Sequence, residues 1–139
     1  MKAIGLIIIL ICCLGCQPGI EETKNILTGY WTIEQVTLEN GTSKAYNYSG
    51  LIDHYTFSEA FSGVKKKVQP QFSGRYKITD DALEFKLIDS ARSLFLKYKN
   101  DTSQWQEEIL QINNSRLKLK LENNLIYLYK RYQPLDINP

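Results

Sequence analysis

The chain has 139 residues, 43% of them hydrophobic, and a formal net charge of +2 at pH 7. This length predicts one domain, with enough apolar surface to form its own core. The small net charge excludes the basic excess of a nucleic-acid-binding protein, so we expect no nucleic-acid partner.

The first 15 residues have the composition of an export signal. A positive Lys2 precedes an isoleucine- and leucine-rich run that is well short of the ~20 residues needed to span a bilayer. The run ends in Gly15-Cys16, which resembles the lipobox of bacterial lipoproteins, although Cys13 stands where leucine is usual. The resemblance implies removal of residues 1–15 and acylation of Cys16. A plain secretory signal is the alternative.

A lipid on Cys16 would anchor the protein, since each buried methylene contributes ~0.8 kcal/mol and several chains hold firmly. The expected location is the bacterial cell envelope, attached to the outer membrane, with the periplasmic and surface faces both open. Cys12 and Cys13 would leave with the signal, so no thiol pair would remain for a disulfide. Residues 16–25, which include Pro18 and Gly19, are interpreted as the acylated cysteine and a tether.

Beyond the tether, apolar and polar residues alternate with a period of two, which is typical of half-buried strands. Asn and Asp pairs between the alternating runs indicate tight turns, Asp80-Asp81 among them. Residues 58–68 do not alternate, and we interpret them as a short helix or a long hairpin loop. The predicted strands are 29–38, 43–49, 51–58, 70–78, 82–89, 92–99, 104–112, 116–121 and 125–132.

Successive strands joined by tight turns predict an all-β antiparallel meander over residues 26–132, followed by a tail at 133–139. A meander of this size usually closes, because closure removes sheet edges that would otherwise pair with other chains. We therefore predict an eight-stranded barrel, with a two-sheet β-sandwich as the alternative.

The segment Gly29-Tyr30-Trp31 resembles the Gly-x-Trp signature of lipocalins and the wider calycin group. The resemblance implies a lipocalin-like barrel in which the tryptophan closes one end. In that group an arginine or lysine of the last strand packs across the tryptophan ring, and Lys130 and Arg131 are both candidates. We favour Arg131, because a guanidinium stacks on indole better than an ammonium does. Gly29, Trp31 and Arg131 are thus the predicted barrel-closing residues.

The sequence shows no arrangement that favours catalysis or metal binding, so we expect no enzyme, cofactor or metal. The single histidine, His54, falls on the opposite face from Tyr55, which indicates a surface or rim position. Glu107 shares the face of Trp105 and indicates partial burial. The run Lys65–Lys67 is interpreted as a solvated loop, with contact to anionic lipid as the alternative.

The chain is rich in aromatic residues, and by alternation many of them share the apolar faces of the predicted strands. We expect a barrel that binds a small hydrophobic or amphipathic ligand in the envelope. The alternative is a filled barrel that acts as a protein-interaction module: an inhibitor, an immunity protein or an accessory subunit. The candidate ligand-lining residues are Tyr46, Tyr48, Tyr55, Phe57, Tyr76, Phe85, Tyr98 and Trp105.

Overall fold

A computed structural model describes residues 17–45, 51–71 and 75–133. Within these ranges the chain forms one short helix and nine strands. The helix precedes all of the strands in the sequence. The elements are α1 (Ile20–Leu27), β1 (Gly29–Thr37), β2 (Ser43–Ala45), β3 (Ile52–Glu59), β4 (Ser62–Pro70), β5 (Tyr76–Ser90), β6 (Ser93–Lys99), β7 (Gln104–Ile112), β8 (Arg116–Lys120) and β9 (Ile126–Arg131).

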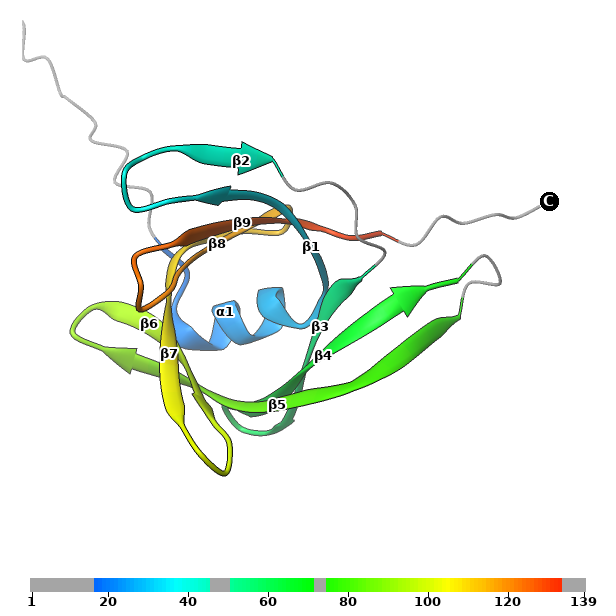
Figure 1. Cartoon of the computed structure of the whole chain (residues 1–139). Coiled ribbons are helices and arrows are strands. Elements are labelled where there is room, and N and C mark those ends of the chain that lie inside the picture. The colour runs from blue at the N-terminus through cyan, green and yellow to red at the C-terminus, as the bar shows by residue number, and fades with distance from the viewer. Residues whose placement is uncertain (1–16, 46–50, 72–74, 134–139) are drawn as a thin grey trace, which may run out of the picture.

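The strands form one antiparallel sheet in the order β2-β1-β3-β4-β5-β6-β7-β8-β9. β9 also pairs with β1, which closes β1 and β3–β9 into an eight-stranded barrel, seen along its axis in Figure 1. β2 lies outside this ring and pairs only with residues 35–37 of β1. The predicted all-β antiparallel barrel is confirmed, and the two-sheet alternative is wrong.

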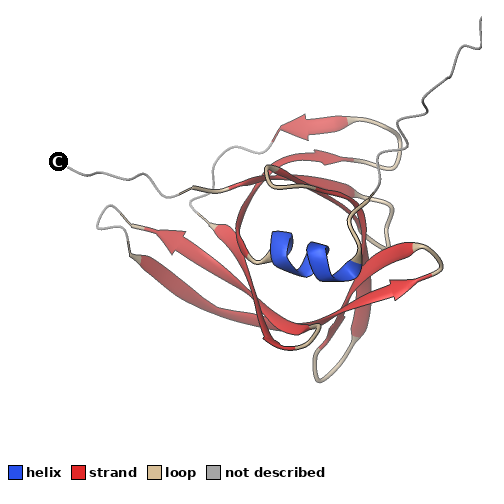
Figure 2. Cartoon of the chain, turned by 180° about the vertical axis from the view of Figure 1, so that it is seen from behind, coloured by secondary structure: helices blue, strands red, loops and turns tan. Residues whose placement is uncertain are grey.

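The helix α1 lies across one end of the barrel, as Figure 2 shows from behind. It includes most of the residues that were predicted to form a tether. That prediction was therefore wrong from Ile20 onward. Glu21 and Glu22 occupy the first turn, where negative charge favours the helix dipole. Thr23 and Leu27 lie one turn apart and are fully buried, so packing against the barrel stabilises a helix too short to persist alone. No helix among the described residues is long and apolar enough to cross a membrane.

Strand β4 occupies most of the segment predicted as a helix or loop, so that prediction was wrong. β4 pairs with β3 on one side and with β5 on the other. Its inward positions include Gly63 and Lys65 rather than large apolar residues, which hides the period of two. Gly63 is required, because a Cβ there would lie 2.2 Å from the carbonyl oxygen of Thr56 and 2.7 Å from the Phe85 ring.

Strand β5 runs through the predicted turn at Asp80-Asp81, so residues 76–78 and 82–89, predicted to lie in two strands, lie in one. The pairing with β4 shifts at this point: Lys66 faces Ala82, while Val68 faces Ile78. Three residues of β5 thus stand opposite one residue of β4. The acidic pair falls in a bulge, which bends the strand without ending it.

The barrel is filled unequally along its axis. Near α1 the interior is packed with buried apolar side chains, and towards the other end polar side chains take over the inward positions. The candidate site lies where the inward side chains change from apolar to polar. The apolar part is formed by Leu27, Trp31, Phe85, Leu87, Leu94, Leu96, Ile109, Ile112, Leu117 and Leu119, each at most 6% exposed.

Candidate binding site in the barrel interior

The closed end of the barrel is built on Trp31 and Arg131, which face each other across the β1–β9 pairing. The guanidinium carbon of Arg131 lies 3.9 Å from the centroid of the Trp31 ring. Arg131 also donates hydrogen bonds to the carbonyl oxygens of Thr28 (3.1 Å), Asn114 (3.2 Å) and Ile26. The indole nitrogen of Trp31 donates to the carbonyl oxygen of Leu27 at 2.9 Å. These two side chains thereby tie the C-terminal end of α1 to the barrel.

Gly29 makes this closure possible for two separate reasons. Its φ of +130° lies in a region that residues with a Cβ rarely adopt. A Cβ at this position would also lie 2.8 Å from the Nη1 atom of Arg131. The glycine of the Gly-x-Trp motif therefore leaves room for the guanidinium that covers the tryptophan.

The predicted ligand-lining aromatics fall into two groups along the axis. Phe57 and Phe85 pack edge to face, with ring centroids 5.3 Å apart, and belong to the apolar filling next to α1. Tyr98 and Trp105 stack at 5.4 Å, and Tyr55 is fully buried. Tyr46 and Tyr48 lie outside the described residues, and only the backbone of Tyr76, in β5, is described.

Charged and hydroxyl side chains gather inside the barrel where the apolar filling ends. They come from five strands, and each occupies an inward position of its strand. Their burial is nearly complete for the two acidic residues, since Asp53 is 5% exposed and Glu107 is 8% exposed. We call this set the polar cluster: Asp53 and Tyr55 from β3, Lys65 and Lys67 from β4, Tyr98 from β6, Glu107 from β7 and Tyr129 from β9.

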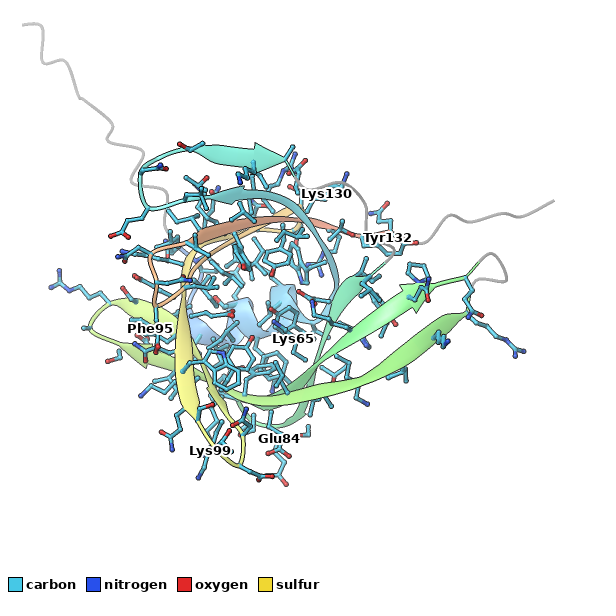
Figure 3. All side chains as sticks on the ribbon, in the orientation of Figure 1. Lys65, Glu84, Phe95, Lys99, Lys130 and Tyr132 are labelled. Carbon is cyan, nitrogen blue, oxygen red and sulfur yellow. The ribbon has the colours of Figure 1, made fainter. Side chains whose placement is uncertain are left out.

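The two lysines of the polar cluster have different surroundings. The ammonium of Lys67 lies 3.4 Å from a carboxylate oxygen of Asp53 and forms a salt bridge with it. The ammonium of Lys65 lies 5.3 Å from the centroid of the Tyr98 ring and 5.9 Å from that of the Tyr55 ring. It forms no hydrogen bond or ion pair with any residue that the structure describes. Figure 3 shows Lys65 within the ring of strands.

Three buried polar atoms of the cluster form no hydrogen bond of normal length with a described residue, although the Tyr98 side chain interacts with those of Tyr55 and Glu107. These three atoms are the hydroxyl oxygens of Tyr55 and Tyr98 and the Oε2 atom of Glu107. Such groups are uncommon, because burying a polar atom without a partner costs ~1–3 kcal/mol. Their presence within one cluster makes this region the candidate binding site.

The ionisation of these groups is shifted in a consistent direction. Burial raises the pKa of Glu107; nearby Lys65 opposes this rise and Asp53 adds to it. Burial also raises the pKa of Tyr55, Tyr98 and Tyr129 well above the ordinary value, and the negative charges of Glu107 and Asp53 add to the rise. The tyrosines therefore stay neutral and able to donate hydrogen bonds, and Glu107 is more readily protonated than an exposed glutamate.

A cavity of about 180 Å³ adjoins the polar cluster. This volume is below the ~300–1,000 Å³ of typical drug-sized sites, but it is similar to an apolar cavity of ~150 Å³ known to hold benzene. The walls combine aromatic and aliphatic surface with one ion pair. They include Trp31, Leu51, Tyr127 and Tyr129 together with Asp53 and Lys67.

The outer wall carries none of these inward groups. His54 stacks on Tyr30 there, with ring centroids 4.1 Å apart, and burial followed by the charge of Lys66 lowers its pKa. A second hollow of about 490 Å³ is lined by the outward side chains of Glu84 and Lys99 and also reaches the inward residues Phe85 and Tyr98. Figure 3 shows Glu84 and Lys99 outside the ring of strands.

The sequence model of the lipocalin-like domain matches residues 27–119, which is more than half of the chain. The chain belongs to this lipocalin-like family. No curated protein matches it.

Several solved structures resemble this lipocalin-like domain at low sequence identity. A lipocalin-like protein from Bacteroides uniformis is 14% identical, with 77% of this chain and 99% of that chain covered and a TM-score of 0.48. An uncharacterized protein from Bacteroides eggerthii is 10% identical, with 76% and 99% covered and a TM-score of 0.48. Lobster apocrustacyanin A1 is 14% identical, with 84% and 67% covered and a TM-score of 0.45.

Sequence reasoning missed most of the polar cluster of this lipocalin-like barrel. Lys65 and Lys67 gave no signal, because three consecutive lysines have no period. Asp53 did give one, because it lies two residues before Tyr55 and so shares its face. Tyr129 gave a similar signal through its parity with Arg131. A charged residue at an inward position of a barrel strand is therefore the pattern that identifies such a cluster.

Proposed function

We propose that this protein is a binding protein of the bacterial cell envelope, held by a lipid on Cys16, whose barrel holds one small amphipathic molecule. The observation that carries the proposal is the polar cluster beside the 180 Å³ cavity. Apolar walls with a few unpartnered polar groups are the usual composition of a small-molecule site. Membership of the lipocalin-like family supports a binding role over a catalytic one.

The size of the cavity limits what this site accepts. Near α1 the interior is filled by Trp31, Phe85 and their neighbours, so a ligand does not extend along the whole axis. The cavity has room for a molecule of about the size of one aromatic ring. The ligand is therefore smaller than a retinoid or a haem.

Native and denaturing mass spectrometry of the whole chain, released from a nonionic detergent, tests the binding role. The chain is kept whole because α1 begins at Ile20 and closes the barrel. We expect extra mass in the native spectrum that is lost on denaturation. A bare chain, also after incubation with an envelope lipid extract, would contradict the binding role and favour a protein partner instead.

Two tryptophan substitutions make this test specific for the cavity. Leu51 lines the cavity, so Leu51→Trp should fill it and remove the extra mass. Ile78 is 59% exposed and does not line the cavity, so Ile78→Trp should leave the extra mass in place. Equal loss in the two variants would mean that the retained molecule binds elsewhere.

Fractionation tests the anchor separately. Cys16→Ala removes the thiol that would carry the lipid, and we expect the protein to leave the membrane fraction. Cys13→Ala keeps Cys16 and should stay in the membrane fraction. Retention of the Cys16→Ala protein in that fraction would rule out this anchor without affecting the binding role.

A further inference from the structure

Lys65 is an unusual residue for the interior of a small barrel. Its ammonium lies near two tyrosine rings and is close enough to Glu107 to oppose the rise in that residue's pKa, but it forms no salt bridge with any described residue. Lys67, two residues further along the same strand, is held by Asp53. The cluster therefore contains one balanced pair and one lysine whose three N–H donors are unused.

The unused hydrogen-bonding groups around Lys65 are mainly donors. The hydroxyl groups of Tyr55 and Tyr98 each add one donor to those of the ammonium. Oε2 of Glu107 is a buried acceptor that likewise has no hydrogen bond of normal length to a described residue. A molecule that satisfies this set must offer oxygen acceptors, and a negative charge would pair with the ammonium.

Charge balance restricts the ligand further. Asp53 and Lys67 cancel each other, so Glu107 and Lys65 decide the net charge of the interior. A single negative charge beside Lys65 is balanced when Glu107 carries a proton, whereas a doubly charged phosphate is not. The titratable groups that face Glu107 are Asp53, Tyr55, Lys65, Lys67, Tyr98 and Tyr129.

We propose that the interior binds a ring-sized monocarboxylate, whose carboxylate contacts the ammonium of Lys65 and the hydroxyl groups of Tyr55 and Tyr98 while Glu107 takes up a proton. The proposal rests on the proposed binding function and names the class of its ligand. The apolar part of the ligand lies in the cavity beside Tyr129. That residue connects the two regions, because it lines the cavity and interacts electrostatically with Glu107 and Tyr98.

The position of Glu107 makes this binding dependent on pH. Burial raises the pKa of this carboxyl group, which makes its protonated form more accessible than that of an exposed glutamate. An ionised Glu107 repels the bound carboxylate, so affinity should fall as the pH rises through the range where Glu107 loses its proton. Protonated Glu107 also donates a hydrogen bond, which adds one more donor to the site.

Three ligands with one ring and different head groups provide the test: benzoate, benzyl alcohol and benzylamine. Each is titrated by calorimetry into the full chain in a nonionic detergent, from mildly acidic to mildly alkaline pH. We expect benzoate to bind most tightly, with one proton taken up at the alkaline end of the range. Proton uptake is read from the dependence of the measured heat on the ionisation enthalpy of the buffer.

Lys65→Met should weaken benzoate binding by roughly tenfold or more, since hydrogen bonds to a charged group are lost. The matched control is Lys66→Met, which removes the same charge from the outer wall, where Lys66 pairs with His54. It should leave the affinity unchanged. Glu107→Gln should strengthen benzoate binding at neutral pH and remove its pH dependence, and it provides the test if Lys65→Met does not fold.

Three results would overturn the proposal. The first is that benzyl alcohol or benzylamine binds as tightly as benzoate. The second is that Lys65→Met and Lys66→Met weaken benzoate binding equally. The third is that none of the three ligands binds. None of them contradicts the proposed binding function, because the mass spectrometric experiment detects a retained molecule whatever its head group.

Discussion

The two halves of the barrel interior treat their buried polar groups in opposite ways. At the end closed by α1, Arg131 donates to three carbonyl oxygens and the indole of Trp31 donates to a fourth. In the polar cluster, the hydroxyl groups of Tyr55 and Tyr98 form no hydrogen bond of normal length with a described residue. Trp31, Tyr55 and Tyr98 are each at most 2% exposed, so burial alone does not separate the two regions. Hydrogen-bond satisfaction separates them.

This contrast predicts how stability and binding divide between the two regions. A satisfied polar network contributes to folding, so its loss should lower the free energy of unfolding. An unsatisfied polar group opposes folding, because its desolvation is not compensated. Substitutions in the two regions should therefore differ in sign as well as in size.

The largest effect is expected from Trp31→Ala at the closed end. Trp31 is fully buried and covered by Arg131, so its truncation should lower the free energy of unfolding by about 3–5 kcal/mol. Guanidinium denaturation followed by circular dichroism measures this change. Trp105→Ala is the comparison, because Trp105 is only partly buried and should cost less. Equal losses would mean that the closed end has no special role in stability.

Gly29→Ala should have the next largest effect, roughly 1–3 kcal/mol, because it adds backbone strain and a contact with Arg131. Gly41→Ala separates these causes, since Gly41 also has a positive φ but has open space around it. Arg131→Ala combined with Gly29→Ala should show coupling between the two sites, measured as a double-mutant cycle. Simple additivity would remove the proposed link between the glycine and the guanidinium.

Tyr98→Phe should change stability in the opposite direction, raising it by roughly 1 kcal/mol. The substitution removes a buried hydroxyl group that forms no hydrogen bond of normal length with a described residue and keeps the ring that stacks on Trp105. The same variant should bind benzoate more weakly. Thermal denaturation and calorimetry on one preparation measure both effects, and a loss of stability would show that the hydroxyl group is satisfied after all.

The smallest effect is a change in the pH dependence of stability. Burial raises the pKa of Glu107 above its usual value of 4.5, so the folded state favours the protonated form. Protonated Glu107 therefore contributes to the free energy of unfolding. This contribution is fully present below pH 4.5 and is lost as the pH rises through the raised pKa of the folded state. Glu107→Gln should therefore gain stability relative to the wild type as pH rises. Parallel curves of unfolding free energy against pH would contradict this assignment.

The barrel was predictable from the sequence because most of its strands bury one face. Leu117 and Leu119 alternate with lysines in β8, and Trp105 and Ile109 mark the inward face of β7. Tertiary context decided the elements that local patterns missed. The Asp80-Asp81 pair has the composition of a turn, yet pairing with β4 carries the strand through it.

The helix and the polar cluster were hidden for different physical reasons. α1 has eight residues and is stabilised by packing on the barrel, a contact that its own sequence does not reveal. Alternation assigns Asp53 and Glu107 to the inward faces of their strands, but it does not show which side chains they contact inside the barrel. Only the closed barrel brings Lys65 from β4 to Tyr98 on β6.

The Arg131 contacts also order events during folding. Arg131 reaches back 105 positions to the carbonyl oxygen of Ile26 and 103 positions to that of Thr28. The helix precedes every strand of the described chain, but its contacts with Arg131 cannot form until the last strand exists and has paired with β1. Until then both β1 and β9 are open edges, able to pair with another chain. The helix therefore gains its bonds to Arg131 only once the chain has been made to its last strand.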